Sequence, residues 1–499
     1  TTTGQAATPH FVVPGPSRPN QQRCKFAMDP NNDTKFVCSY YTAADAAYEN
    51  VNICVGTIDR VNKSISFGTP FVPHTGHMEQ ADGLTYIKSS LAGYHGRFVF
   101  CAELQPGNYS GQCWSMLVAG AGTGTTITLE SGPVQYNSGN RTTYNFVDSD
   151  PHHPGYFMVT HGTVGSTRIC QFYMTPGTGA LAFQSSHTLV GQGMACNSFM
   201  YNPVTVGQGV YVGGGTQPFN HLYIWTVDVN GQNPTATLNS CPHPRTVNGG
   251  HNATYDPNPS NGGKLITSTS MSVAGSDNGS SWCTVNTVSG QTVTFGTEQQ
   301  MTTNTICISQ FAWHPSNNGT FTAYASPAAG ALNGDGSADT DMRMVTGTLS
   351  NTTMTVDIVN NAYKYAPGSA GTDSSNSGFP PFIYDALDPT YYLVGIYPDV
   401  PPKQSAYMYG QVGMHYLGTS VTTQNLTDQA FIGFSNSAYT NGQTATVNIS
   451  GIDDNQTGLT IGSTYYVQLD GTIGTTAATP SVKAGKAVKA TEIIISARG

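Results

Sequence analysis

Residues Cys24–Tyr41 read CKFAMDPNNDTKFVCSYY: an apolar stretch, an Asp-Pro turn and a second apolar stretch. Proline fixes φ and has no backbone N–H, so it belongs just beyond the end of a strand. The asparagines that follow it are typical turn residues. This stretch therefore predicts a β-hairpin.

The same hairpin pattern recurs along the chain, with Asp-Pro, Asn-Pro or His-Pro at the end of the first strand. The prolines concerned are Pro30, Pro151, Pro203, Pro257, Pro315 and Pro389, and the steps from Pro151 to Pro315 are 52, 54 and 58 residues. A weaker copy without proline, Gly83–Leu104, fills the wide gap after Pro30. A second repeat agrees with this spacing, because SISFGTP at Ser64–Pro70 and TVTFGTE at Thr292–Glu298 lie 228 residues apart, which is four periods of 57. We therefore count seven units.

A repeat of 40 to 60 residues with about four short strands and no helical pattern is typical of a β-propeller, whose blades pack radially. We predict an all-β chain with an N-terminal arm at residues 1–20, a seven-bladed β-propeller at 21–419 and a small C-terminal all-β domain at 420–499. The arm, rich in proline, is expected to reach across and complete the ring. A row of β-sandwiches and a β-helix are the alternative architectures.

The low charged fraction and the negative net charge of the chain limit the kinds of partner that it can bind. Charged residues make up 9% of the sequence and the net charge is -9, whereas soluble domains usually carry about 25% charged residues. Binding of nucleic acid requires clustered Lys and Arg, so we expect no nucleic-acid partner. No stretch approaches the roughly 18 apolar residues that span a bilayer, so we expect no membrane insertion.

Ten cysteines are present without a CxxC pair, which argues against zinc-ribbon and thioredoxin-like motifs. Two pairs are candidate disulfides, because each could lie across a hairpin: Cys24 with Cys38, and Cys101 with Cys113. A disulfide depends on the separation of the Cα atoms, which spacing does not give. Free cysteines on half-buried strands are the alternative.

One segment resembles a calcium loop. Asn333–Asp341, NGDGSADTD, alternates oxygen-bearing side chains, which hard cations prefer. Ala338 stands where such a loop has glycine, and Met344 where it has a bidentate acid. We therefore expect a polar loop, no metal site and no cofactor, with calcium as the alternative.

The best candidates for ligand binding are aromatic residues in the loops. Loops between adjacent blades, and loops between the second and third strands of a blade, share one face of a propeller. They carry Tyr109, His243, Tyr363, Tyr365 and Tyr397 amid Asn, Gln and Ser. Aromatic rings and neutral hydrogen-bonding groups suit sugars, so we expect a glycan site here. Aromatic residues that only cover blade ends are the alternative.

Catalysis on glycans would need two carboxylates held about 5–10 Å apart. The acidic residues near predicted loops are Asp45, Glu49, Glu79, Asp82 and Glu103. Propellers expose many loop carboxylates that serve only solubility, so we expect no enzymatic activity.

The C-terminal sequence carries a resemblance to a known family. Phe431–Ile495, which begins FIGFSNSAYTNGQTATVNISGIDD and includes GLTIGSTYYVQLDGTIGTT, resembles the C-terminal domain of tail-fibre-like virion proteins of tailed bacteriophages, particularly phages of cyanobacteria and other aquatic bacteria. Those proteins place units of the form VGT…SISFGTP before that domain, as this chain does at Val55–Pro70.

The resemblance implies a non-enzymatic appendage on the surface of a phage particle. Its implied partners are copies of itself, in a homo-oligomer, other virion proteins and the glycan of the host surface; it implies no catalytic residues. Two alternatives remain. One is a propeller depolymerase that cleaves polysaccharide, and the other is a purely structural component such as a head decoration, a tail nozzle or a self-assembling fibril.

Overall fold

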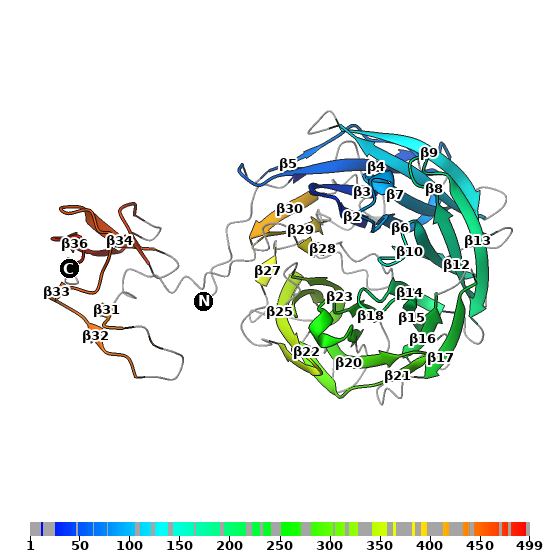
Figure 1. The fold of residues 1–499 in the computed structure, drawn as a ribbon. Helices are drawn as coiled ribbons and strands as arrows, with labels where there is room; N and C mark the ends of the chain where they lie inside the picture. Colours follow the sequence, from blue (N-terminus) through cyan, green and yellow to red (C-terminus); the bar gives the residue numbers. More distant parts are fainter. Residues whose placement is uncertain are drawn as a thin grey trace. The chain divides into compact units, whose positions relative to one another are not determined.

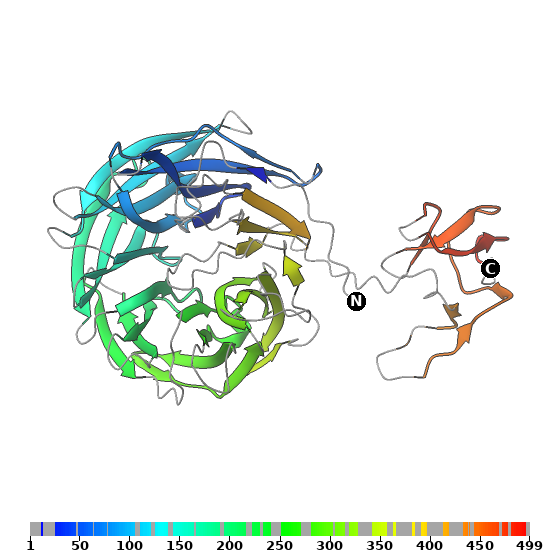
Figure 2. The same cartoon turned by 180° about the vertical axis from the view of Figure 1, so that it is seen from behind.

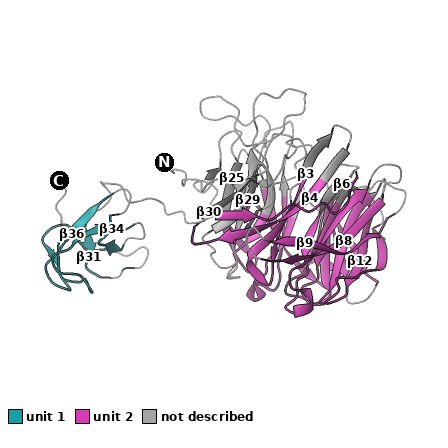
Figure 3. Cartoon of the chain, turned by 90° about the horizontal axis from the view of Figure 1, so that it is seen from above, with its two compact units in different colours: residues 1–5, 420–499 teal, residues 6–419 magenta. Residues whose placement is uncertain are grey.

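The structure, a computed structural model, describes residues 11–12, 25–45, 48–62, 64–76, 78–104, 110–120, 125–137, 143–163, 166–189, 194–215, 222–229, 233–240, 251–270, 281–302, 305–314, 319–327, 342–356, 363–365, 382–384, 391–396, 413–418, 433–437, 439, 444–468, 472–477 and 481–495. The chain divides into two compact units, residues 6–419 and residues 420–499 together with 1–5 (Figure 3).

The described part of the larger unit folds into seven antiparallel sheets, blades 1 to 7, in chain order. Blade 1 holds β2 (Lys25–Asp29), β3 (Asn32–Asp45), β4 (Tyr48–Asp59) and β5 (Ser64–Phe67). Blade 2 holds β6 (Met78–Tyr86), β7 (Arg97–Leu104), β8 (Ser110–Ala119) and β9 (Thr126–Gln135). Blade 3 holds β10 (Thr143–Ser149), β11 (Tyr156–Thr163), β12 (Ser166–Met174) and β13 (Leu181–Leu189). Blade 4 holds β14 (Met194–Tyr201), β15 (Gln208–Gly215), β16 (Leu222–Asp228) and β17 (Thr235–Ser240).

The next two blades have five strands each among the described residues. Blade 5 holds β18 (His251–Tyr255), β19 (Leu265–Ser270), β20 (Ser281–Ser289), β21 (Thr292–Thr294) and β22 (Glu298–Thr302). Blade 6 holds β23 (Thr305–Trp313), β24 (Thr320–Pro327), β25 (Met342–Ser350), β26 (Thr353–Val356) and β27 (Tyr363–Tyr365). Short 3-10 helices lie at Ala92–Tyr94 and Pro259–Asn261.

Blade 7 is completed by the start of the chain. It holds β28 (Phe382–Tyr384), β29 (Tyr391–Ile396) and β30 (Gly413–Gly418), and its fourth strand is β1 (Phe11–Val12). Phe11 lies opposite Met414 and Val12 opposite Gly413. The N-terminal segment therefore joins the last blade as its outer strand, which removes one exposed sheet edge.

The first strand of each blade packs against the first strand of the next, from β2 through β28. The sheets follow one another around a common centre, which Figures 1 and 2 show from opposite sides. The fold of the larger unit is thus the predicted seven-bladed β-propeller. The weak copy at Gly83–Leu104 supplies β6 and β7, so blade 2 is a full member of the ring.

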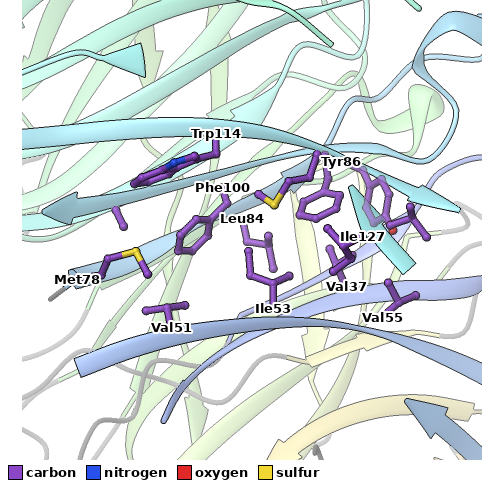
Figure 4. Packing of buried hydrophobic residues seen from close by; sticks show 14 residues of the cluster. Val37, Val51, Ile53, Val55, Met78, Leu84, Tyr86, Phe100, Trp114 and Ile127 are labelled. Carbon is purple, nitrogen blue, oxygen red and sulfur yellow. The ribbon is translucent and has the colours of Figure 1, made fainter. Parts of the chain in front are cut away.

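Apolar side chains are buried between neighbouring blades rather than in one central core. Figure 4 shows the cluster between blades 1 and 2, in which Val37, Ile53 and Val55 face Phe100 and Trp114. Similar clusters follow between later blades. Alternating strand residues supply these clusters, since successive side chains point to opposite faces of a sheet.

The repeated Phe-Gly-Thr segment interrupts the outer strand of blades 1 and 5. A Cβ atom on Gly68 would lie 2.5 Å from Thr125 O, and one on Gly296 would lie 2.2 Å from Val285 O. Only glycine permits such an approach of backbone to backbone. Pairing resumes beyond it, at Phe71 in blade 1 and along β22 in blade 5.

The smaller unit is all-β among its described residues. One sheet pairs β31 (Phe434–Ser435) with β32 (Val447–Asn448). The other has the order β33 (Ile452–Asp453), β37 (Ile493–Ile495), β36 (Lys483–Ala487), β34 (Thr464–Val467) and β35 (Ile473–Gly474). Ala484, Ala487 and Ile493 are fully or almost fully buried in its core.

Candidate functional site

The propeller has two ends, defined by its connections. We call the end with the connections from second to third strand, and from one blade to the next, the loop end. The opposite end, with the turns from first to second strand, is the turn end. In a sheet of four consecutive antiparallel strands, these two sets of connections necessarily lie at opposite ends of the strands.

The expected glycan residues belong to connections of the loop end. The structure describes the strand ends on either side of three of these connections. They are Leu104 and Ser110, Ser240 and His251, and Ile396 and Gly413. The residues themselves, Tyr109, His243 and Tyr397, lie outside the described residues. Whether they come together is therefore still a prediction.

Tyr363 and Tyr365 lie on a strand, not in the loop that we expected. They form β27, where Tyr363 is opposite Met344 and Tyr365 is opposite Met342 of β25. The alternating Tyr-Lys-Tyr sequence favours a strand, because aromatic residues fit a pleated surface. The two tyrosines thus occupy alternate positions of an outer strand, at the loop end of blade 6.

Polar groups at the turn end are used to build the turns. The residue before each described proline of the hairpin repeat caps its own turn: Asp29 Oδ1 accepts from Asn31 N–H at 2.9 Å, and Asp150 Oδ1 accepts from His152 N–H at 2.8 Å. Asn202 and Asp256 repeat this bond in blades 4 and 5. Burial nevertheless raises the pKa of Asp29 and of Asp256.

The same turns tie each blade to the next. Asn31 Nδ2 donates to Ser89 O at 2.9 Å, from blade 1 to the segment that follows β6 in blade 2. His152 Nε2 lies 3.0 Å from Asn202 O, from blade 3 to blade 4. Asn261 Nδ2 donates to Leu349 O at 3.1 Å, from blade 5 to blade 6. These three side chains therefore link neighbouring blades.

One aromatic group at the turn end was not anticipated from the sequence. Tyr156 and Tyr173 are directly opposite on β11 and β12, with ring centroids 4.9 Å apart, and both are partly exposed. His153, whose Nδ1 lies 2.9 Å from Asp150 Oδ2, precedes them in the turn. The Tyr-Phe-Met and Gln-Phe-Tyr stretches could have indicated this pair, had the register of the two strands been known.

Two acidic residues are brought together at the loop end. Glu79, the second residue of β6, is opposite Glu103, the penultimate residue of β7. Directly opposed residues on antiparallel strands have Cβ atoms about 4.5–5.5 Å apart. The Glu103 residue is fully buried. Among the acidic residues considered as candidates for catalysis, Glu79 and Glu103 are thus a pair in direct register.

A buried histidine and cysteine lie next to this region in blade 3. His161 Nε2 is 3.7 Å from Cys170 Sγ, and the His161 ring is 5.1 Å from that of Tyr136. Burial lowers the pKa of His161 to about 3 and raises the pKa of Cys170 to about 12. The thiol therefore stays protonated and the imidazole neutral near pH 7, which is the reverse of an activated cysteine.

The two expected disulfides have different outcomes. Cys101 and Cys113, directly opposite on β7 and β8, are bonded, with Cα atoms 4.3 Å apart. Cys38 lies opposite Phe26 on β2 and opposite Cys54 on β4, and the sulfur that it meets is that of Cys54. Cys24 lies outside the described residues. The register of β3 thus gives Cys38 a different neighbour from the one that spacing indicated.

No group of three or more His, Cys, Asp or Glu side chains that could hold a metal occurs in the part of the chain that the structure describes. The expected polar loop at Asn333–Asp341 lies outside that part. Across the described ranges, no helix has the length and apolar character needed to cross a membrane.

Comparison with solved structures finds distant similarities. Similar chains are Saccharomyces cerevisiae Sqt1 (8% identity, 83% of this chain and 99% of that one, TM-score 0.45) and an oligogalacturonate lyase in complex with manganese (9%, 84% and 98%, TM-score 0.43). An α-L-arabinofuranosidase of Fusarium graminearum is also similar (9%, 84% and 99%, TM-score 0.38). The sequence matches no family model and no curated protein. The class that the fold defines is a seven-bladed β-propeller protein, and likenesses this distant carry no argument about activity.

Proposed function

We propose that this chain is a non-enzymatic appendage protein of a phage particle that binds glycan on the bacterial surface. It would act as a homo-oligomer, attached to other virion proteins. The observation that carries the proposal is the contrast between the two ends of the propeller. Several polar side chains of the turn end, Asn31, His152 and Asn261, hold one blade to the next, whereas the glycan candidates belong to the loop end.

The chemistry of the candidates supports recognition of a neutral polymer. Sugars offer apolar ring faces that stack on aromatic rings, and hydroxyl groups that exchange hydrogen bonds with amides and hydroxyls. A chain with 9% charged residues would recognise such a ligand without relying on ion pairs. The resemblance of Phe431–Ile495 to tail-fibre-like proteins supports the location on a particle.

The binding proposal is tested with the purified full chain on an array of bacterial capsular and lipopolysaccharide glycans. We expect binding that the Tyr363→Ala/Tyr365→Ala variant weakens at least tenfold. A matched control is Tyr156→Ala/Tyr173→Ala, which removes two rings from the turn end. Weakening by the control alone would show that the assigned face is wrong, and no binding by the wild type would contradict the glycan proposal.

The location is tested by immunogold electron microscopy of particles purified from the source sample, with antibody raised against the full chain. Gold at fibre or tail tips is expected. Gold along capsids or free filaments, together with no glycan binding, would favour the purely structural alternative. Absence of the protein from the particles would contradict a virion role.

A polysaccharide-cleaving enzyme is the second candidate, because Glu79 and Glu103 are directly paired. Retaining glycosidases hold their two carboxyl groups about 5–5.5 Å apart. The test is the release of reducing ends from any glycan that the full chain binds. Release that both Glu79→Gln and Glu103→Gln abolish, while binding persists, would replace the non-enzymatic proposal.

A further inference from the structure

We propose that Cys38 and Cys54 are the site of a second disulfide, which links the second and third strands of blade 1. Their sulfur atoms lie 3.1 Å apart, and the two residues are directly opposite on β3 and β4. Both residues are fully buried. A pair of sulfurs that meet in this way needs little movement to bond.

The backbone register places the two Cα atoms at a suitable separation. Ile53 exchanges both of its backbone hydrogen bonds with Phe71, and Val55 O accepts from Gly68 N–H, so both residues direct their backbone groups away from β3. Cys54, between them, directs its own backbone groups towards Cys38. Such hydrogen-bonded pairs have Cα atoms about 5.5 Å apart, within the 4.4–6.8 Å that disulfides span.

The neighbouring blade contains a disulfide between the same two strands, although its Cα atoms, 4.3 Å apart, have the spacing of a non-hydrogen-bonded pair. Cys101 and Cys113 also lie directly opposite on the second and third strands of their blade, and they form a disulfide. The two strand pairs are equivalent in the order of the repeat. A covalent link between these two strands is therefore compatible with the blade.

The bond would form by thiol–disulfide exchange with a disulfide-bearing oxidant. A thiolate of one cysteine attacks the oxidant to give a mixed disulfide, and the second thiolate displaces the oxidant's remaining sulfur. The two cysteine sulfurs lose two electrons in total, which reduce the oxidant to two thiols, and these take up the two protons. Since both sulfurs are buried in the folded blade, the exchange must precede the packing of blade 1.

The site is tested on the wild-type full chain, folded in the presence of oxidised and reduced glutathione. The protein is denatured, treated with N-ethylmaleimide without reductant, digested and examined by mass spectrometry. We expect a peptide pair linked through Cys38 and Cys54, with loss of two hydrogens, and at least a tenfold increase in labelling of both residues after reduction. The Cys101–Cys113 peptide pair serves as the positive control.

Two results would overturn the proposal. One is full labelling of Cys38 and Cys54 while Cys101 and Cys113 are linked, and the other is a link from Cys38 to Cys24. The Cys54→Ser variant adds an independent measurement, since labelling of Cys38 without reductant should rise to completion in it. If this variant does not fold, the peptide map of the wild type still decides.

Discussion

The buried ion pair of Arg97 and Glu130 within blade 2 should be a main stabilising contact of that blade, at its border with blade 3. Arg97 Nε and Nη2 donate to the Glu130 carboxylate at 2.8 and 2.6 Å, and its side chain is 8% exposed. Nη1 donates to Gly93 O, and Nη2 also donates to Gly177 O, at the β12–β13 turn of blade 3. The Arg97 guanidinium thus forms an ion pair with Glu130 and also donates hydrogen bonds to two backbone carbonyl groups.

Replacement of Arg97 by Met should lower the free energy of unfolding by about 3–5 kcal/mol, because the Glu130 charge is left buried without a partner. Replacement of both residues, Arg97→Met with Glu130→Leu, should recover at least about 2 kcal/mol of that loss. Gly177 O would still lose the donor that Arg97 supplies, at about 1 kcal/mol, whereas Gly93 O keeps its bond from Gly177 N–H.

The assay is urea unfolding of the full chain, followed by the fluorescence of tryptophans that include the fully buried Trp114 of blade 2. Arg60→Met is the matched control, because its pair with Asp33 is longer, at 3.9 Å, and more exposed. We expect the control to cost about 1 kcal/mol or less. A loss below about 1 kcal/mol for Arg97→Met, or no recovery in the double variant, would refute the reasoning.

Three further predictions concern a buried base, a glycine and the closing strand. Burial lowers the pKa of His161 to about 3 in the folded chain, so as pH falls below about 6.5 only the unfolded chain gains this proton. Stability should then fall by about 1.4 kcal/mol per pH unit from this group, and His161→Gln should remove that part of the pH dependence; an unchanged slope would contradict it. Gly296→Ala should cost about 2–4 kcal/mol, because its Cβ would lie 2.2 Å from Val285 O. When both variants are compared by thermal unfolding, Gly290→Ala, which meets no atom within 4 Å but has φ of 55°, should cost only about 1 kcal/mol; equal losses would show that contact is not the cause. Deletion of residues 1–12 removes the pairing of β1 with β30 and should cost about 2 kcal/mol by calorimetry, whereas an unchanged unfolding temperature would mean that blade 7 closes without β1.

The frame of the propeller could be predicted because its determinants are local. An apolar strand, a capped turn and a second strand lie within about twenty residues of one another, and the pattern repeats. The repeated SISFGTP segment at Ser64–Pro70 also falls on the outer strand of blade 1, which the structure places at Ser64–Phe67. The local pattern did not explain why Asp or Asn precedes the proline. The structure shows that this side chain accepts a hydrogen bond from the backbone of the turn and so caps it.

Contacts between distant residues could not be predicted in this way. Arg97 and Gly177 are 80 residues apart, and nothing in either neighbourhood indicates the other. Cys38 illustrates the same limit at short range, because β3 has a neighbour on each side. Cys24 and Cys54 lie at similar distances from it along the chain, so only the register of the strands distinguishes them.

The choice between binding and cleavage depends on one strand pair in blade 2. Two ionised carboxylates directly opposite on neighbouring strands would destabilise a sheet, so the pairing of Glu79 with Glu103 would carry a cost in the ionised form of both residues. If the pair has only a structural role, replacement of either glutamate by Gln should raise the free energy of unfolding without loss of function. If the pair is catalytic, the same replacement should raise the free energy of unfolding and abolish cleavage. Measurement of both properties on Glu103→Gln therefore separates a structural role from a catalytic one.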